Sequence, residues 1–291
     1  MSEKELEVFS VLSFLNSGYQ LEDISEHGDF DIFSSAEECA NYLIENDYLS
    51  NNGRSTSPQD ISKNYTVAQL KEILRENNLK VSGKKQELVE RVMSILSDKS
   101  EDLSLTDKAK EFLEENKWMD LYMFALVAFN FEDYENFHKN SSADDFNTAL
   151  NFCDQILSFA LIKNQFLIFL DALSAKAHVY AYGKDYESFL DYDLQRFILG
   201  LNPFNMDSKT YSNYEIINNA NIINLKNVIE HFDFGDLKKR FNKIWKKSNI
   251  SKITVPKNAS YKILLKALSG EDIEELNFDL KEKYFYEKFS K

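Results

Sequence analysis

The stretch Lys63–Leu96, KNYTVAQLKEILRENNLKVSGKKQELVERVMSIL, carries the clearest structural signals in the chain. Thr66 is followed three residues later by Gln69, which is a capping box and predicts the start of a helix. Asn77 and Asn78 end that helix, because asparagine tolerates the left-handed conformation common at helix C-termini. The apolar positions are Leu70, Ile73 and Leu74 in this helix and Leu88, Val89, Val92, Ile95 and Leu96 in the next. Their spacing predicts two short helices whose apolar faces meet across a tight turn.

The polar positions of the same stretch are mostly basic. Seven lysines and arginines stand against four glutamates, a net charge of about +3, in a chain whose formal net charge is −14. Such a contrast is typical of a nucleic-acid contact. Ser82 is the expected cap of the second helix, whose free N-terminal amides suit a phosphate oxygen. The residues predicted to contact nucleic acid are Lys71, Arg75, Gly83, Lys84, Lys85 and Arg91.

These residues resemble a SAP module, a helix-turn-helix DNA-binding unit. Its pattern is a Ser or Thr cap, Leu-Lys, a further Leu, a Gly-Leu turn, Gly-x-Lys, and Leu-x-x-Arg before an aliphatic residue. The matching positions are Thr66, Leu70-Lys71, Leu74, Asn78-Leu79, Gly83-Lys84-Lys85 and Leu88-Val89-Glu90-Arg91-Val92. Asn78 stands where Gly is usual, and Val92 where Leu or Ile is usual. The resemblance implies weak, largely non-sequence-specific binding to duplex DNA and no catalysis; an ordinary surface hairpin of helices is the alternative.

The composition of the whole chain predicts an all-α fold. Of 291 residues, 43% are hydrophobic, and eight glycines and three prolines are too few for a turn-rich β architecture. We expect a small helix-turn-helix SAP-like module and a larger irregular α-helical bundle. The expected parts are a helical segment at 1–50, the module at 61–97 and a helical domain at 104–291, with subdomains 104–205 and 206–291 as an alternative.

Other features favour a cytoplasmic protein without cofactors. Cys39 and Cys153 have no paired spacing, so neither a disulfide nor a metal site is expected. No basic region precedes an apolar run at the N-terminus, which argues against a signal peptide. The most apolar stretch, Ile156–Leu170, is too short and too polar to span a bilayer. No membrane partner, metal or cofactor is therefore predicted.

The flanks of the module predict short helices and polar joints. Helices are expected at 3–16 and 36–44, a loop at Glu22–Phe33, and polar joints at 51–60 and 98–104. Tyr48-Leu49 before the module and Leu105-Thr106-Asp107-Lys108-Ala109 after it resemble the ends of a winged-helix domain, with Ala109 in place of Gly and no clean wing strands. That resemblance implies that the module is inserted in a small DNA-binding domain; a plain helical cap is the alternative.

The C-terminal part predicts consecutive helices. One apolar helix is expected at Trp118–Phe131, and three more at 149–159, 165–182 and 186–199, with one at the C-terminal end after Gly270. Their short connections predict antiparallel packing.

A second basic segment, Leu237–Lys257, holds eight basic residues and no acidic one. Phe241, Ile244 and Trp245 fit the apolar face of a helix whose other sides are basic. The candidate surface residues are Lys238, Lys239, Arg240, Lys243, Lys246 and Lys247. Three interpretations remain open: a second phosphate contact, neutralisation of acidic neighbours such as Asp233, Asp236 or 271–275, and binding to a membrane surface.

No motif in the sequence indicates catalysis. It lacks a Gly-rich phosphate loop, Gly-x-Ser-x-Gly and His-Glu-x-x-His, and the four histidines have no ligand spacing. The leading hypothesis is a non-enzymatic DNA-binding adaptor with a protein partner or self-association. The alternatives are an assembly or structural accessory factor, for instance of a bacterium, phage or mobile element, and a metal-dependent DNA-processing enzyme.

Overall fold

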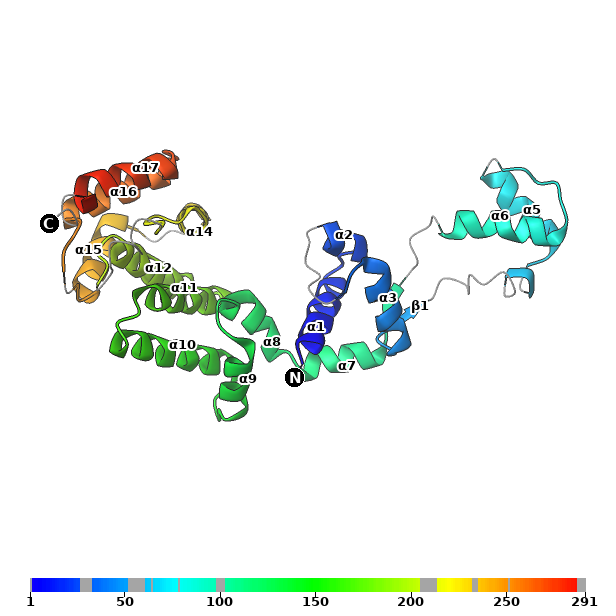
Figure 1. Cartoon of the computed structure of the whole chain (residues 1–291), viewed down its shortest axis with the longest axis horizontal. Helices are drawn as coiled ribbons and strands as arrows, with labels where there is room; N and C mark the ends of the chain where they lie inside the picture. The colour runs from blue at the N-terminus through cyan, green and yellow to red at the C-terminus, as the bar shows by residue number, and fades with distance from the viewer. Residues whose placement is uncertain are drawn as a thin grey trace. The chain divides into compact units, whose positions relative to one another are not determined.

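The computed structural model describes residues 2–26, 33–51, 61–63, 65–77, 79–97, 103–204, 214–231, 235–250 and 252–286, and the structural statements below concern these residues. They form helices and one two-stranded ribbon, which confirms the all-α prediction (Figure 1). Contacts divide the chain into two units, Met1–Met119 and Asp120–Lys291. Most of both expected polar joints, together with Asn78 and Asp233, lies outside the described residues.

The first unit contains short helices around a small apolar core. Its elements outside the module are α1 (Glu3–Asn16), α2 (Leu21–Glu26), α3 (Ala36–Glu45), β1 (Leu49–Asn51), β2 (Leu103–Leu105) and α7 (Asp107–Glu115). The hydroxyl of Ser35 accepts a hydrogen bond from the amide of Glu38 and starts α3, as the sequence predicts. The loop predicted at Glu22–Phe33 is wrong over its first residues. Leu21 and Ile24 are buried in the core and hold the short helix α2 there.

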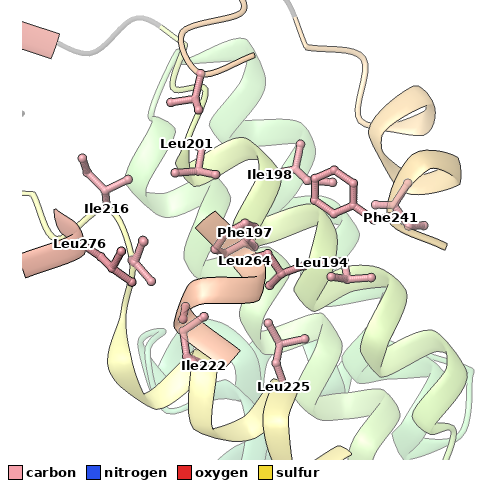
Figure 2. Packing of buried hydrophobic residues seen from close by; sticks show 14 of the residues in the cluster. Leu194, Phe197, Ile198, Leu201, Ile216, Ile222, Leu225, Phe241, Leu264 and Leu276 are labelled. Atoms are coloured by element: carbon pink, nitrogen blue, oxygen red, sulfur yellow. The ribbon is translucent and has the colours of Figure 1, made fainter. Parts of the chain in front are cut away.

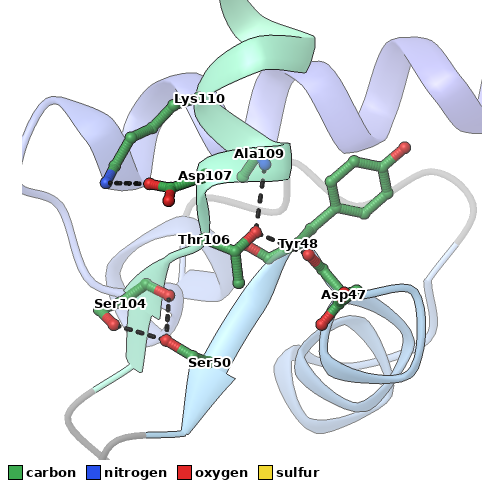
Figure 3. Close-up of polar contacts among 8 residues, drawn as sticks. All are labelled: Asp47, Tyr48, Ser50, Ser104, Thr106, Asp107, Ala109 and Lys110. Carbon is green, nitrogen blue, oxygen red and sulfur yellow. Dashed lines mark hydrogen bonds and ion pairs between the residues drawn. The ribbon is translucent and has the colours of Figure 1, made fainter.

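The strands β1 and β2 pair directly, although residues 52–102 separate them in the sequence. The antiparallel pairs are Leu49 with Leu105, Ser50 with Ser104 and Asn51 with Leu103. The two serine hydroxyls are 2.7 Å apart across the ribbon (Figure 3). Residues 52–102 are therefore inserted between two paired strands.

Thr106 joins the ribbon to α7 (Figure 3). Its hydroxyl donates to the carbonyl oxygen of Asp47 at 2.6 Å and accepts from the amide of Ala109 at 3.2 Å. Further along α7, the ring of Phe112 packs edge-on against that of Phe9 at 6.3 Å between centroids. These contacts place β2 and α7 in the first unit, which extends past position 104, where a separate helical domain was expected to begin.

The second unit is built from helices throughout its described residues. The elements are α8 (Trp118–Leu121, which spans the boundary), η1 (Tyr122–Leu126), α9 (Phe131–Lys139), α10 (Asp145–Ile162), α11 (Phe166–Tyr182), α12 (Tyr186–Gly200), α14 (Asn219–His231), α15 (Leu237–Lys247), α16 (Lys257–Leu268), α17 (Ile273–Lys281) and η2 (Glu282–Tyr286). The single helix predicted at Trp118–Phe131 is confirmed over residues 118–126, as α8 and η1, and is wrong over its last residues. The chain turns after η1, and the side chain of Asn130 accepts from the amide of Asp133 to begin α9.

The helices α10, α11 and α12 pack consecutively against one another, in line with the short connections. The largest core cluster joins the inner face of α12 to α14, α15, α16 and α17 (Figure 2). Leu194, Ile198 and Leu264 in this cluster are fully buried, as are Leu201 and Val255. None of the described helices combines the length and the apolar character needed to cross a bilayer.

Asp193 is the most deeply buried carboxylate of this unit, at 2% exposure. One of its oxygens accepts from Asn221, and the other has no hydrogen-bond partner. Burial raises the pKa of Asp193, and the positive charge of Arg196 opposes this shift in part. The stabilising contribution of the protonated carboxyl is therefore lost as the pH rises through the folded-state pKa.

We expect Asp193→Asn to increase the free energy of unfolding at about pH 8, because it removes a poorly compensated buried charge. The gain should shrink as the pH falls toward about 4, because the raised pKa of the wild-type carboxyl lets it take up its proton before that pH is reached. Urea unfolding at both pH values measures the difference. The exposed Asp279→Asn is the control for the loss of one carboxylate from the surface. A gain at low pH equal to that at high pH would contradict the assignment.

Candidate nucleic-acid interface

The module consists of α5 (Val67–Glu76) and α6 (Lys85–Ser97). The predicted capping box is present: the amide of Gln69 donates to the Thr66 hydroxyl at 3.3 Å, and the amide of Thr66 donates to the Gln69 side chain at 2.9 Å. At the other end of α5, the side-chain amide of Asn77 donates to the carbonyl oxygen of Ile73 at 2.8 Å. Local hydrogen bonds therefore fix both ends of this helix.

The module has an apolar core of its own. Its buried members are Ile61, Leu70, Leu74, Leu88, Val89 and Val92, with Tyr65, Ile73 and Val81 packed around them. Ile61 precedes the stretch from which the core was predicted, and it is only 1% exposed. The ammonium of Lys85 donates to the carbonyl oxygen of Ser62 at 2.5 Å and ties this preceding turn to α6. Lys85, predicted as a phosphate contact, is thus engaged inside the module.

The connector between the helices is shaped by Gly83 and Arg91. Gly83 has φ +141°, and a β-carbon there would meet the side chains of Glu87 and Arg91, the latter at 2.8 Å from Nη2. The guanidinium of Arg91 donates to the carbonyl oxygens of Lys80 and, at 2.9 Å, of Ser82. Arg91 therefore braces the connector through two of its carbonyl oxygens. Ser82 was expected to cap α6 with its side chain, and in the structure its carbonyl oxygen accepts from Arg91.

The other basic residues of the module lie at its surface. Within the described part of the chain, no ion pair or hydrogen bond engages the side chains of Lys63, Lys71, Arg75, Lys80 and Lys84. Lys71 and Arg75 stand one turn apart on α5, whereas Lys80 and Lys84 flank the connector that Arg91 braces. Of the six predicted contacts, Lys71, Arg75 and Lys84 remain available to a phosphate, while Gly83, Lys85 and Arg91 build the surface. Lys63 and Lys80 are also available to a phosphate. Their exposed positions in the basic charge pattern were the signal that could have identified them.

The inward role of Arg91 gives a direct test. A lysine cannot reproduce a planar fork that reaches two carbonyl oxygens, so Arg91→Lys should destabilise the module by about 1–2 kcal/mol. We expect Arg91→Lys and Arg91→Ala to weaken DNA binding to a similar extent, with matching losses of stability. Urea unfolding and fluorescence anisotropy on a labelled duplex measure both effects. If Arg91→Lys binds DNA like the wild type while Arg91→Ala does not, the arginine acts as a charge at the phosphate.

The second predicted basic surface lies on α15 in the other unit. Arg240 is engaged by acidic residues of its own unit. Its Nε donates to Asp191 at 2.6 Å, and its guanidinium also pairs with Glu187. Lys238, Lys239, Lys243, Lys246 and Lys247 are exposed. The structure thus separates one structural arginine from five outward lysines.

Comparison with known families supports the reading of the module. Residues 62–96 match the family model of the SAP domain, about one eighth of the chain, and the match includes the capping box, Gly83 and Arg91. No curated protein and no solved structure matches the chain. The chain is therefore a SAP-domain-containing protein, as the residue pattern indicated.

Proposed function

We propose that this protein is a non-enzymatic DNA-binding adaptor whose SAP domain contacts the phosphates of duplex DNA. The observation that carries the proposal is a set of cations, unpaired among the described residues, on a domain that matches a DNA-binding family: Lys63, Lys71, Arg75, Lys80 and Lys84. Two of them flank a connector whose backbone Arg91 holds in place. Four of these five cations are lysines, which meet phosphates as point charges, so we expect binding that depends weakly on sequence.

The acidic balance of the chain confines contact with DNA to its basic segments. The formal net charge of the whole chain is −14, and like charge repels a duplex from most of the surface. Neutralisation of about four phosphates then gives weak binding that decreases steeply as salt increases. A targeting role alongside other components fits this low affinity.

A protein partner is part of the proposal. Large apolar side chains are exposed at the end of α10 and the start of α11: Phe159, Leu161, Ile162 and Leu167, with Ile162 at 78% exposure. Exposed apolar groups of this kind favour protein contact. They also favour the alternative of an assembly factor, in which the helical unit holds a partner and the SAP domain serves the complex.

Binding of the full chain to a labelled duplex, measured by anisotropy over a range of salt, tests the proposal. We expect affinity to fall by at least about a hundredfold between 50 and 200 mM salt. Binding that ignores salt, or turnover of the DNA by the purified chain in the presence of a divalent metal, would overturn it.

A further inference from the structure

The outer face of α15 is a concentrated cationic surface. Five lysines, Lys238, Lys239, Lys243, Lys246 and Lys247, line a shallow depression of about 590 Å³ along the helix. The lysines recur at intervals of about four residues, so successive rows stand about 6 Å apart along the axis. The acidic residue at this surface is Asp236, and its carboxylate accepts from the amides of Lys238 and Lys239 as the cap of the helix.

Neutralisation of acidic neighbours does not account for these lysines. Among the described residues, Arg240 takes the contacts to Glu187 and Asp191, and Lys243 reaches Asp191 only at 3.9 Å. Glu271, named from the sequence as an acidic neighbour, pairs with Lys266 at 2.7 Å. Lys238, Lys239, Lys246 and Lys247 have no ion pair in the described part of the chain.

Insertion into a membrane surface does not fit either. A helix that lies in a membrane interface buries its apolar face among the lipids. In α15, Phe241 and Ile244 are 1% and 3% exposed and belong to the core of the unit, with Trp245 packed beside them (Figure 2 labels Phe241). The helix keeps no exposed apolar face, and what it offers to solvent is positive charge.

We propose that α15 is a second phosphate-binding surface, which contacts the backbone of duplex DNA. The five lysines span nine residue steps, about 13.5 Å of helix, so they supply one charge per about 3 Å. A duplex presents one phosphate charge per about 1.7 Å of axis, so several phosphates face a surface of this length. The choice of DNA over other polyanions rests on the function proposed above.

The test uses the full chain with Lys238, Lys239, Lys246 and Lys247 replaced by Gln. We expect the slope of log affinity against log salt on a labelled duplex to lose about 3 in magnitude, and affinity at 100 mM salt to fall at least about tenfold. A matched variant with Lys110, Lys117, Lys163 and Lys262 changed to Gln has the same net charge and should leave the slope unchanged. Circular dichroism and thermal unfolding verify that each variant is folded.

The outcomes separate this inference from the proposed function. An unchanged slope in the α15 variant, alongside a reduced slope in a variant of the SAP-domain cations, overturns the second surface and leaves the adaptor function intact. If the α15 variant loses binding to phosphatidylserine vesicles but keeps its DNA slope, the surface serves lipid headgroups and the inference is overturned. A reduced DNA slope in the α15 variant supports the inference, whatever the SAP-domain variant does.

Discussion

A protein in which Asn51 is joined to Leu103 through Asn-Gly, with residues 52–102 removed, should stay folded and lose the SAP-domain part of its DNA affinity. Asn51 and Leu103 are partners at the open end of the ribbon, and Asn-Gly forms the two-residue turn that such a hairpin prefers. The contacts of Ser50 with Ser104 and of Thr106 with Asp47 remain in place. Loss of about four phosphate contacts predicts an affinity at least about a hundredfold lower at low salt.

Thermal unfolding followed by circular dichroism and anisotropy on a labelled duplex check this pair of results. A chain that no longer folds would show that the inserted segment is part of the core of the first unit. A folded chain with unchanged affinity would show that the DNA contact lies outside the SAP domain.

Replacement of Lys71, Arg75, Lys80 and Lys84 by Gln should abolish most of the same affinity without unfolding the domain. These side chains lack partners in the described structure, so their removal costs no internal contact. Their charge is the attraction to phosphate, and we expect a loss of about a hundredfold at low salt. The core and the brace formed by Arg91 are untouched.

The comparison variant carries Gln at Lys110, Lys117, Lys163 and Lys262, which lie outside both proposed surfaces. Both variants change the net charge equally, so a loss confined to the first identifies local contact and excludes a general effect of charge. Equal losses in the two would contradict a defined interface. Urea unfolding of each variant controls for stability.

The sequence predicts the SAP domain well because its signals are local. A capping box, a helical apolar period and a basic connector all fall within a few residues of one another, and each survives in the structure. The all-α fold follows from composition in the same way. The short helix α2 could not be predicted in this way, because six residues are too few to show a helical period. Only the burial of Leu21 and Ile24 in the structure reveals it.

The ribbon could not be predicted with any assurance, because each strand is three residues long and its partner lies beyond the whole module. Strand pairing at that separation depends on the core that brings the ends together. The resemblance of the flanks to a winged-helix domain pointed to an insertion, while the paired strands themselves carried no visible alternation.

The roles of the long cationic side chains also could not be predicted from the sequence. Lys85 and Arg91 look like phosphate contacts in the sequence, because charge and position near a helix N-terminus are all that it displays. The structure turns Lys85 to the carbonyl of Ser62 and Arg91 to the connector. Which way a flexible basic side chain turns depends on carbonyls that only the folded chain places within reach.

The central claim is that the SAP domain binds DNA through its free cations, and the salt dependence of affinity measures those contacts most directly. Anisotropy titrations of the full chain and of the variant at Lys71, Arg75, Lys80 and Lys84 give two slopes of log affinity against log salt. The account predicts that the magnitude of the slope is smaller by about 3 to 4 in the variant than in the wild type, about 0.9 for each phosphate contact removed. Two equal slopes would contradict it.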